Sequence, residues 1–123
     1  MLIRYKKTYE KIAMGLLSYM PEAQSVKMLQ EKIQMYETDE SLELYLWKAE
    51  EDFIGILGIE MEEDCYTLLD LAVNPSFRGE GIGKNMVHAI QQRYPEKQCH
   101  STTITETFLQ KCSQKEDRQE GEA

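Results

Sequence analysis

Apolar positions along the chain change their period several times, and each change predicts a new element of secondary structure. Between residues 8 and 36 they recur every three or four positions, which predicts two amphipathic helices. The first covers residues 8–20 and is ended by Pro21, and the second begins at Ser25 as its N-cap. From residue 42 to 47 leucines alternate with larger or charged residues, which predicts a half-buried strand.

The remaining segments complete the order of elements. Short apolar runs predict strands at residues 2–6, 53–61, 65–73 and 99–104. A third helix follows the glycines near residue 80 and closes before Pro95, and a fourth covers residues 107–114. Hairpin-connected strands beside a strand–helix–strand crossover predict a mixed α+β fold, with helices on both faces of one sheet.

The segment from residue 70 to 84 carries the most specific signal. An apolar run stops at Asn74-Pro75, a turn signal, and Gly79, Gly81 and Gly83 then alternate up to the start of a helix. Glycines at such positions allow positive φ and close approach of a ligand, and a helix start adds unpaired N–H donors and partial positive charge. This pattern predicts a phosphate or pyrophosphate site.

Spacing separates this loop from other phosphate loops. A Walker loop needs a glycine where Arg78 stands and Ser or Thr where Asn85 stands, and a dinucleotide fingerprint needs a third glycine where Lys84 stands. The run Arg78-Gly-Glu-Gly-Ile-Gly83 instead fits Gln/Arg-x-x-Gly-x-Gly/Ala. With the preceding Leu-Ala-Val-Asn-Pro, it resembles the acyl-coenzyme A loop of the GNAT (GCN5-related N-acetyltransferase) family.

The resemblance covers about nine-tenths of the chain and implies a central mixed, mostly antiparallel sheet flanked by four helices. It implies that acetyl-CoA is held between the fourth and fifth strands, which splay apart beyond a bulge. Leu71 and Val73 would pair with the pantetheine arm through their backbones, and an N–H near Ala72 or Val73 would stabilise the developing oxyanion. The remaining cofactor-binding candidates are Arg78, Gly79, Glu80, Gly81, Ile82, Gly83, Lys84, Thr102 and Thr105.

Acetyl transfer by direct attack requires that the amine lose a proton to a carboxylate or to a water that the carboxylate orients. Asp70, Glu60 and Glu62 are the candidates, because they lie on or next to the third and fourth strands. Asp70 is favoured because it interrupts an apolar run, although a structural hydrogen-bonding role fits it too. The two glutamates also fit as solvent-facing strand residues.

The chain departs from the family pattern in two places. The tyrosine that often acts as general acid in the fourth helix, and the asparagine that often contacts the cofactor arm, are absent; Tyr94, His100 and Cys112 are possible substitutes for the acid. The family's sixth and seventh strands are also missing, and a polar tail from about residue 114 to 123, predicted to be disordered, stands in their place. An uncovered fifth strand predicts a homodimer.

Composition limits the class of partner. The 123 residues fit one domain, residues 1–123, and a net charge of −8 argues against nucleic acid or an anionic membrane as a partner. The N-terminal segment lacks an apolar signal region, and three cysteines without a CxxC pair fit free thiols in the cytoplasm and no metal site.

Three functions remain open. The first is an N-acetyltransferase for an amine of unknown identity, and the second is a CoA-binding regulatory or scaffold protein with little turnover. The third is a structural interaction module whose loop binds no ligand. Within the family the sequence most resembles a small acetyltransferase-like protein encoded among bacterial riboflavin-biosynthesis genes, which implies a link to riboflavin metabolism.

Overall fold

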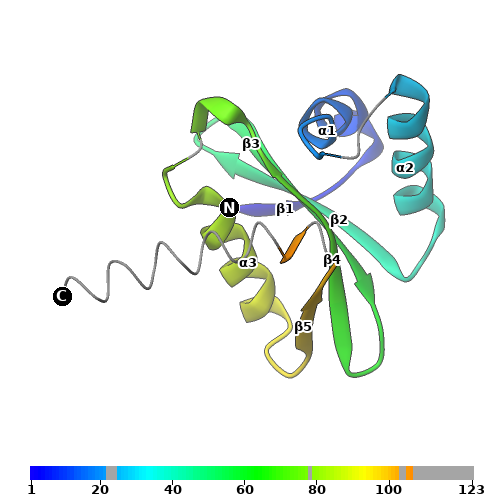
Figure 1. Cartoon of the computed structure of the whole chain (residues 1–123), viewed down its shortest axis with the longest axis vertical. Coiled ribbons are helices and arrows are strands. Elements are labelled where there is room, and N and C mark those ends of the chain that lie inside the picture. Colours follow the sequence, from blue (N-terminus) through cyan, green and yellow to red (C-terminus); the bar gives the residue numbers. More distant parts are fainter. Residues whose placement is uncertain (22–24, 78, 103–104, 107–123) are drawn as a thin grey trace.

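The computed structural model describes residues 1–21, 25–77, 79–102 and 105–106 (Figure 1). Its sheet has five strands in the order β1-β2-β3-β4-β5. The strands are β1 (Leu2–Arg4), β2 (Leu42–Ala49), β3 (Asp52–Met61), β4 (Cys65–Val73) and β5 (Gln98–Ser101). Neighbours from β1 to β4 are antiparallel, whereas β5 runs parallel to β4, so the sheet is mixed and mostly antiparallel as predicted.

Helices cover both faces of this sheet (Figure 1). The N-terminal pair, α1 (Glu10–Leu17) and α2 (Val26–Thr38), packs on one face, and α3 (Ile82–Arg93) packs on the other. Short 3₁₀ turns, η1 (Lys7–Tyr9) and η2 (Pro75–Phe77), precede α1 and follow β4. The predicted fourth helix at residues 107–114 and the tail at 114–123 lie outside the described residues. No helix in the described part of the chain has the length and apolarity needed to cross a bilayer.

One apolar core lies on each side of the sheet. The first packs α1 and α2 against one sheet face and includes Leu16, Ile33 and Ile56. The second packs α3 against the opposite face and includes Leu57 and Met86. The consecutive residues Ile56 and Leu57 belong to different cores because side chains alternate along a strand. The sheet is therefore buried on both sides over its centre.

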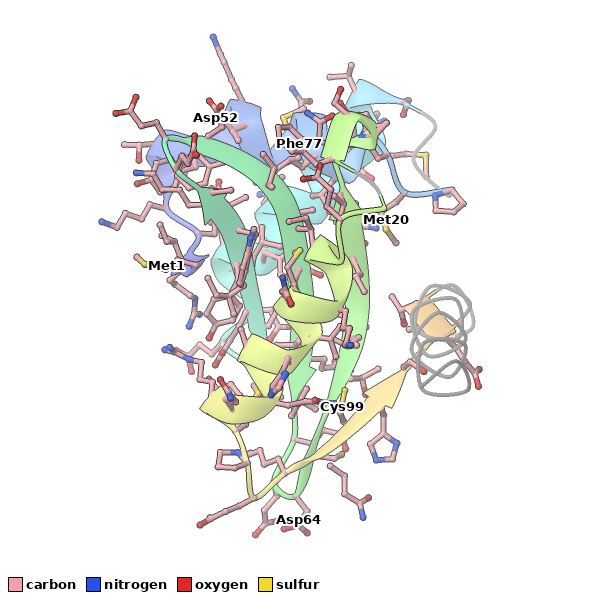
Figure 2. All side chains as sticks on the ribbon, turned by 90° about the vertical axis from the view of Figure 1, so that its left-hand side faces the viewer. Met1, Met20, Asp52, Asp64, Phe77 and Cys99 are labelled. Atoms are coloured by element: carbon pink, nitrogen blue, oxygen red, sulfur yellow. The ribbon has the colours of Figure 1, made fainter. Side chains whose placement is uncertain are left out.

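Strand β4 carries a bulge that divides it into two parts. Gly58 of β3 pairs with Asp70, but the next residue, Ile59, pairs with Leu68, so Leu69 is an extra residue on β4. Before the bulge, residues Cys65 to Leu68 pair with β5. After it, β4 continues to Val73 beyond the last residue of β5, and Figure 2 shows β5 diverging from the sheet. The fourth and fifth strands thus part at the bulge, as predicted.

The fifth strand is shorter than predicted. Residues 99–104 were predicted to be extended; the observed β5 ends at Ser101, and residues 103 and 104 lie outside the described residues. Its end coincides with a side-chain turn, because the Thr102 and Thr105 hydroxyls bond each other's backbone N–H groups at 3.2 and 2.8 Å. Such hydroxyl-to-backbone bonds compete with strand pairing.

Candidate active site

The C-terminal end of β4 leads directly into the glycine loop. The Asn74 side chain accepts a hydrogen bond from the Ser76 N–H at 2.9 Å, and its carbonyl accepts one from the Phe77 N–H, so the predicted turn is formed. Gly79 and Gly81 follow with φ of 88° and 76°. Figure 2 places Phe77 at the opposite end of the molecule from Asp64, in the β3–β4 hairpin. The loop therefore occupies one end of the sheet.

The geometry of the loop fits a diphosphate. Both positive-φ glycines face open space, since a Cβ built at either one meets no atom within 4 Å. Gly81 is the N-cap of α3 and has no side chain with which to cap it, and the N-terminus of the helix, the positive end of its dipole, adjoins the loop. Gly83 differs from the other two, because it is a buried residue inside α3 without a positive φ. Arg78 lies outside the described residues.

Between the bulge and the glycine loop, the backbone N–H and C=O groups of successive β4 residues point to opposite edges of the strand. The Asn74 N–H donates to the Ile54 carbonyl of β3 at 2.8 Å. Because successive backbone groups of a strand point to opposite edges, those of Leu71 and Val73 point to the β5 side, whereas those of Ala72 point to β3. The two residues predicted to pair with the pantetheine arm therefore share the edge from which β5 has diverged.

A cavity of about 260 Å³ lies beside the bulge, between α2 and the sheet. Its wall combines three apolar side chains with four polar ones. The lining residues are Lys32, Met35 and Tyr36 from α2, Leu42 from β2, Leu69 and Asp70 from β4, and Thr102 after β5. It thus opens where β4 and β5 part.

Asp70 is the buried acid of this cavity, at 1% exposure. Its Oδ2 accepts a hydrogen bond from the Tyr36 hydroxyl at 2.5 Å, and its Oδ1 accepts one from the Lys32 ammonium at 2.7 Å. Both partners come from consecutive turns of one helix face, since they are four residues apart. Hydrogen bonds that involve an ionised partner are roughly twice as strong as neutral ones, so the carboxylate is firmly oriented.

Gly58 makes this contact possible. It lies on β3 directly opposite Asp70, and a Cβ at this position would stand 1.9 Å from the Tyr36 hydroxyl oxygen. Only glycine therefore leaves room for the tyrosine to reach across β3 to Asp70. Gly55, the other glycine of this strand, similarly leaves room for the Met86 sulfur, at 2.6 Å from a built Cβ.

The two threonines predicted to contact the cofactor, Thr102 and Thr105, both follow β5, but only Thr102 lines the cavity among the described residues. Thr105 is buried, and its hydroxyl donates to the Leu68 carbonyl at 2.9 Å, at the last β4 residue before the bulge. This hydrogen bond therefore connects the segment after β5 to the bulge of β4.

The two candidate glutamates lie outside the cavity lining. Glu60 is partly buried and shares the α2 face of β3 with Gly58, two residues before it. Glu62 lies exposed in the β3–β4 hairpin, where its carboxylate accepts a hydrogen bond from the Cys65 thiol at 3.3 Å. Five residues of strand, about 16 Å, separate Cys65 from Asp70. Of the three carboxylates, only Asp70 lines the cavity.

Two of the three residues considered as substitute acids lie elsewhere in the structure. Tyr94 packs with the α3 core and donates to the Glu43 carboxylate at 2.7 Å. His100 is exposed on β5, and Cys112 lies outside the described residues. Sequence reasoning missed Tyr36 and Lys32, which it counted only as part of a helix.

The fold is that of a class of acetyltransferases. Residues 9–112 match the Acetyltransferase (GNAT) family, and the chain belongs to that family. Acetyl-CoA, the acetyl donor of this family, is the co-substrate of the protein. A relative from Bacillus methanolicus, described as an uncharacterized N-acetyltransferase in the lysA 3′ region, is 49% identical over 113 residues, which cover 91% of this chain and 94% of the relative.

Solved structures share the fold at low sequence identity. The aminoglycoside acetyltransferase AAC(6′)-Iy, in complex with the bisubstrate analogue CoA-S-monomethyl-acetylneamine, matches with a TM-score of 0.74 and 19% identity over 93% of this chain and 86% of that one. The same enzyme in complex with CoA matches with a TM-score of 0.73 and 20% identity, covering 93% and 84%. At these identities the likeness establishes the fold, so the acceptor has to be inferred from the cavity.

Proposed function

We propose that the protein transfers the acetyl group of acetyl-CoA to an amine by direct attack in a ternary complex, with Asp70 as the general base. The observation that carries this proposal is a buried carboxylate in the wall of a cavity at the split between β4 and β5. The same strand leads from this carboxylate to the glycine loop, so one element connects the reacting end of the site with the diphosphate end.

Residues of the β4 edge and the loop are proposed to hold acetyl-CoA. Leu71 and Val73 present backbone groups to the edge where the pantetheine arm would lie, and the amides from residue 79 to 84, together with Arg78, would hold the diphosphate. Of the two predicted oxyanion donors, the Val73 N–H points to this edge and the Ala72 N–H does not. The oxyanion donor is therefore proposed to be Val73.

Asp70 is proposed to take the proton that an ammonium must lose before it can react. An ionised carboxylate has about four acceptor sites, and Tyr36 and Lys32 fill two of them, so a substrate ammonium or a water can use another. The freed nitrogen attacks the thioester carbon, its second proton passes to solvent, the C–S bond breaks, and CoA leaves as a thiolate that is stable near neutral pH. Tyr36 and Lys32 act as positioning residues, because they fix the carboxylate.

Two measurements test the proposal. Isothermal titration with acetyl-CoA should show binding that Gly81→Val abolishes, because valine at φ 76° is strained and its side chain enters the open space of the loop. Gly15→Ala, at a helical position with open space, is the control. Release of free thiol from acetyl-CoA across a panel of amines then reports transfer. Unchanged affinity of Gly81→Val would contradict the loop assignment.

A CoA-binding regulatory or scaffold role is the second candidate. The absence of the family's fourth-helix tyrosine favours it. It predicts acetyl-CoA binding without thiol release for any amine, whereas the buried Asp70 in an open cavity favours turnover. Mass spectrometry of the reaction products distinguishes the two, because only the enzyme yields an acetylated amine.

Three finer assignments belong to the same proposal. A link to riboflavin metabolism rests on resemblance to RibT, the small acetyltransferase-like protein of bacterial riboflavin operons, and amine-bearing riboflavin intermediates in the panel test it. A homodimer is proposed because β5 is an outer strand of the sheet, and light scattering at micromolar concentration tests it. A cytoplasmic location fits the free thiols of Cys65 and Cys99, and cell fractionation tests it.

A further inference from the structure

We propose that Lys32 determines acceptor specificity, because its ammonium neutralises Asp70 inside the cavity and so favours amines with a single positive charge on an apolar body over diamines and polyamines. This inference rests on the acetyl transfer proposed above and names the class of amine that the cavity accepts. The proposal follows from the charges that line the cavity and from the character of its remaining wall.

Among the residues that the structure describes, those lining the cavity carry no net charge. Two of these seven residues are charged, and these two, Asp70 and Lys32, are in contact at 2.7 Å. One substrate ammonium therefore finds one carboxylate, to which it can donate a hydrogen bond. A second ammonium on a short substrate finds no second carboxylate among the described lining residues and stands close to the Lys32 ammonium. Repulsion between two cations a few ångströms apart near a protein surface is worth about tenfold to a hundredfold in affinity.

In the described part of the chain, the other elements that face the cavity do not supply a second negative charge. From α2 the cavity receives Lys32, Met35 and Tyr36, and from β2 it receives Leu42. Glu60 of β3 lies on the same sheet face but does not line the cavity. A diamine short enough to stay inside therefore keeps an ammonium that finds no anionic partner among the described residues, and burying such a charge is costly.

The rest of the wall suits an apolar substrate body. Met35, Leu42 and Leu69 provide aliphatic and thioether surface next to the charged pair. Met35 is 58% exposed, so its flexible side chain stands at the solvent side of the cavity. A methylene chain attached to the reacting nitrogen can lie against these three residues.

A matched pair of amines tests the proposal. n-Butylamine and 1,4-diaminobutane have the same four-carbon chain and differ by one ammonium group. The kcat/KM for butylamine should exceed that for the diamine by about tenfold or more in the wild-type protein, with most of the difference in KM. Binding of both amines to the CoA-loaded protein, measured by isothermal titration, should show the same preference.

Variants separate the charge of Lys32 from its packing. Lys32→Gln should reduce the preference by about tenfold or reverse it, because Asp70 is then unneutralised, whereas Lys32→Arg should retain the preference. Lys27→Gln, exposed on the same helix, changes the net charge equally and should leave the ratio unchanged. Thermal melts of all three variants report whether the fold is kept.

Each outcome decides between the two proposals. Selective binding of butylamine without thiol release supports the selection by charge and overturns acetyl transfer. Equal or tighter binding of the diamine by the wild-type protein overturns selection by charge, whether or not the diamine is acetylated. Failure of both amines to bind, or an unchanged ratio in a folded Lys32→Gln variant, overturns it as well.

Discussion

Replacing Asp70 by asparagine removes one negative charge from the cavity and keeps the shape of the side chain. The wild-type carboxylate accepts hydrogen bonds from the Tyr36 hydroxyl and the Lys32 ammonium. Hydrogen bonds to charged groups contribute about 1.5–3 kcal/mol each. The Lys32 bond counts at the low end, because that side chain is 28% exposed and can turn to water. Asparagine still accepts one bond and costs less to bury, so the expected loss of unfolding free energy is about 2 kcal/mol.

Activity should fall much further than stability. A positioned general base contributes typically 10²–10⁴-fold, so kcat/KM of Asp70→Asn should drop by about 10² or more. The glycine loop is unaffected, and the affinity for acetyl-CoA should therefore stay within about twofold. Thiol release, chemical denaturation and titration with acetyl-CoA measure the three quantities on the same preparation.

The matched control is Asp64→Asn, which makes the same chemical change at an exposed hairpin position. This variant should change the free energy of unfolding by no more than about 0.5 kcal/mol and kcat/KM by no more than about twofold. A folded Asp70→Asn variant that retains kcat/KM within about threefold of the wild type would refute the assignment of Asp70 as the base.

Three further experiments test the architecture. Gly58→Ala should destabilise the protein by about 1–3 kcal/mol and lower turnover, because its Cβ displaces Tyr36, whereas Gly15→Ala in open space should stabilise by about 0.5–1 kcal/mol; equal melting temperatures would contradict this. Ser25→Ala should cost about 1 kcal/mol in chemical denaturation, because the serine caps α2, and no change would argue against the cap. Burial raises the pKa of the Cys99 thiol, so less thiolate is present at pH 7.5 and alkylation should be slower in the folded than in the unfolded protein; equal rates would contradict it.

Local patterns were sufficient to predict most elements of the fold. The strand at Cys65–Val73 was predicted with its observed bounds, and the Ser25 cap forms as expected, with the serine hydroxyl accepting a bond from the Met28 N–H. These features depend on periodicity and on short-range hydrogen bonds, which the sequence displays directly. The first strand and the first helix are shorter than predicted, at Leu2–Arg4 and Glu10–Leu17, because periodicity does not mark where an element frays.

The loop half of the site was predictable and the cavity half was only partly so. Gly79 and Gly81 have the positive φ that their spacing indicated, and Asp70 is buried as its apolar neighbours suggested. The partners of Asp70 depend on where α2 packs against the sheet, because only one position of the helix brings Lys32 and Tyr36 next to Asp70. No local sequence pattern encodes that position. Their signal was indirect: a lysine and a tyrosine four residues apart interrupt the apolar face of a helix, and a glycine interrupts a strand where nothing local requires it.

One extra residue in β4 accounts for the position of the acid. Leu68 belongs to the α3 core. If side chains alternated regularly from Leu68, Leu69 would face α2, Asp70 would face α3 and Leu71 would face α2. Leu71 instead belongs to the α3 core as well. The bulge makes Leu69 and Asp70 both line the cavity on the α2 side, because an inserted residue shifts the alternation by one. The pairing of β4 with β5 ends immediately before this residue, at Leu68. The same irregularity therefore brings a carboxylate to the α2 face and lies where β5 leaves the edge of β4, which is why the acid and the split in the sheet occur together.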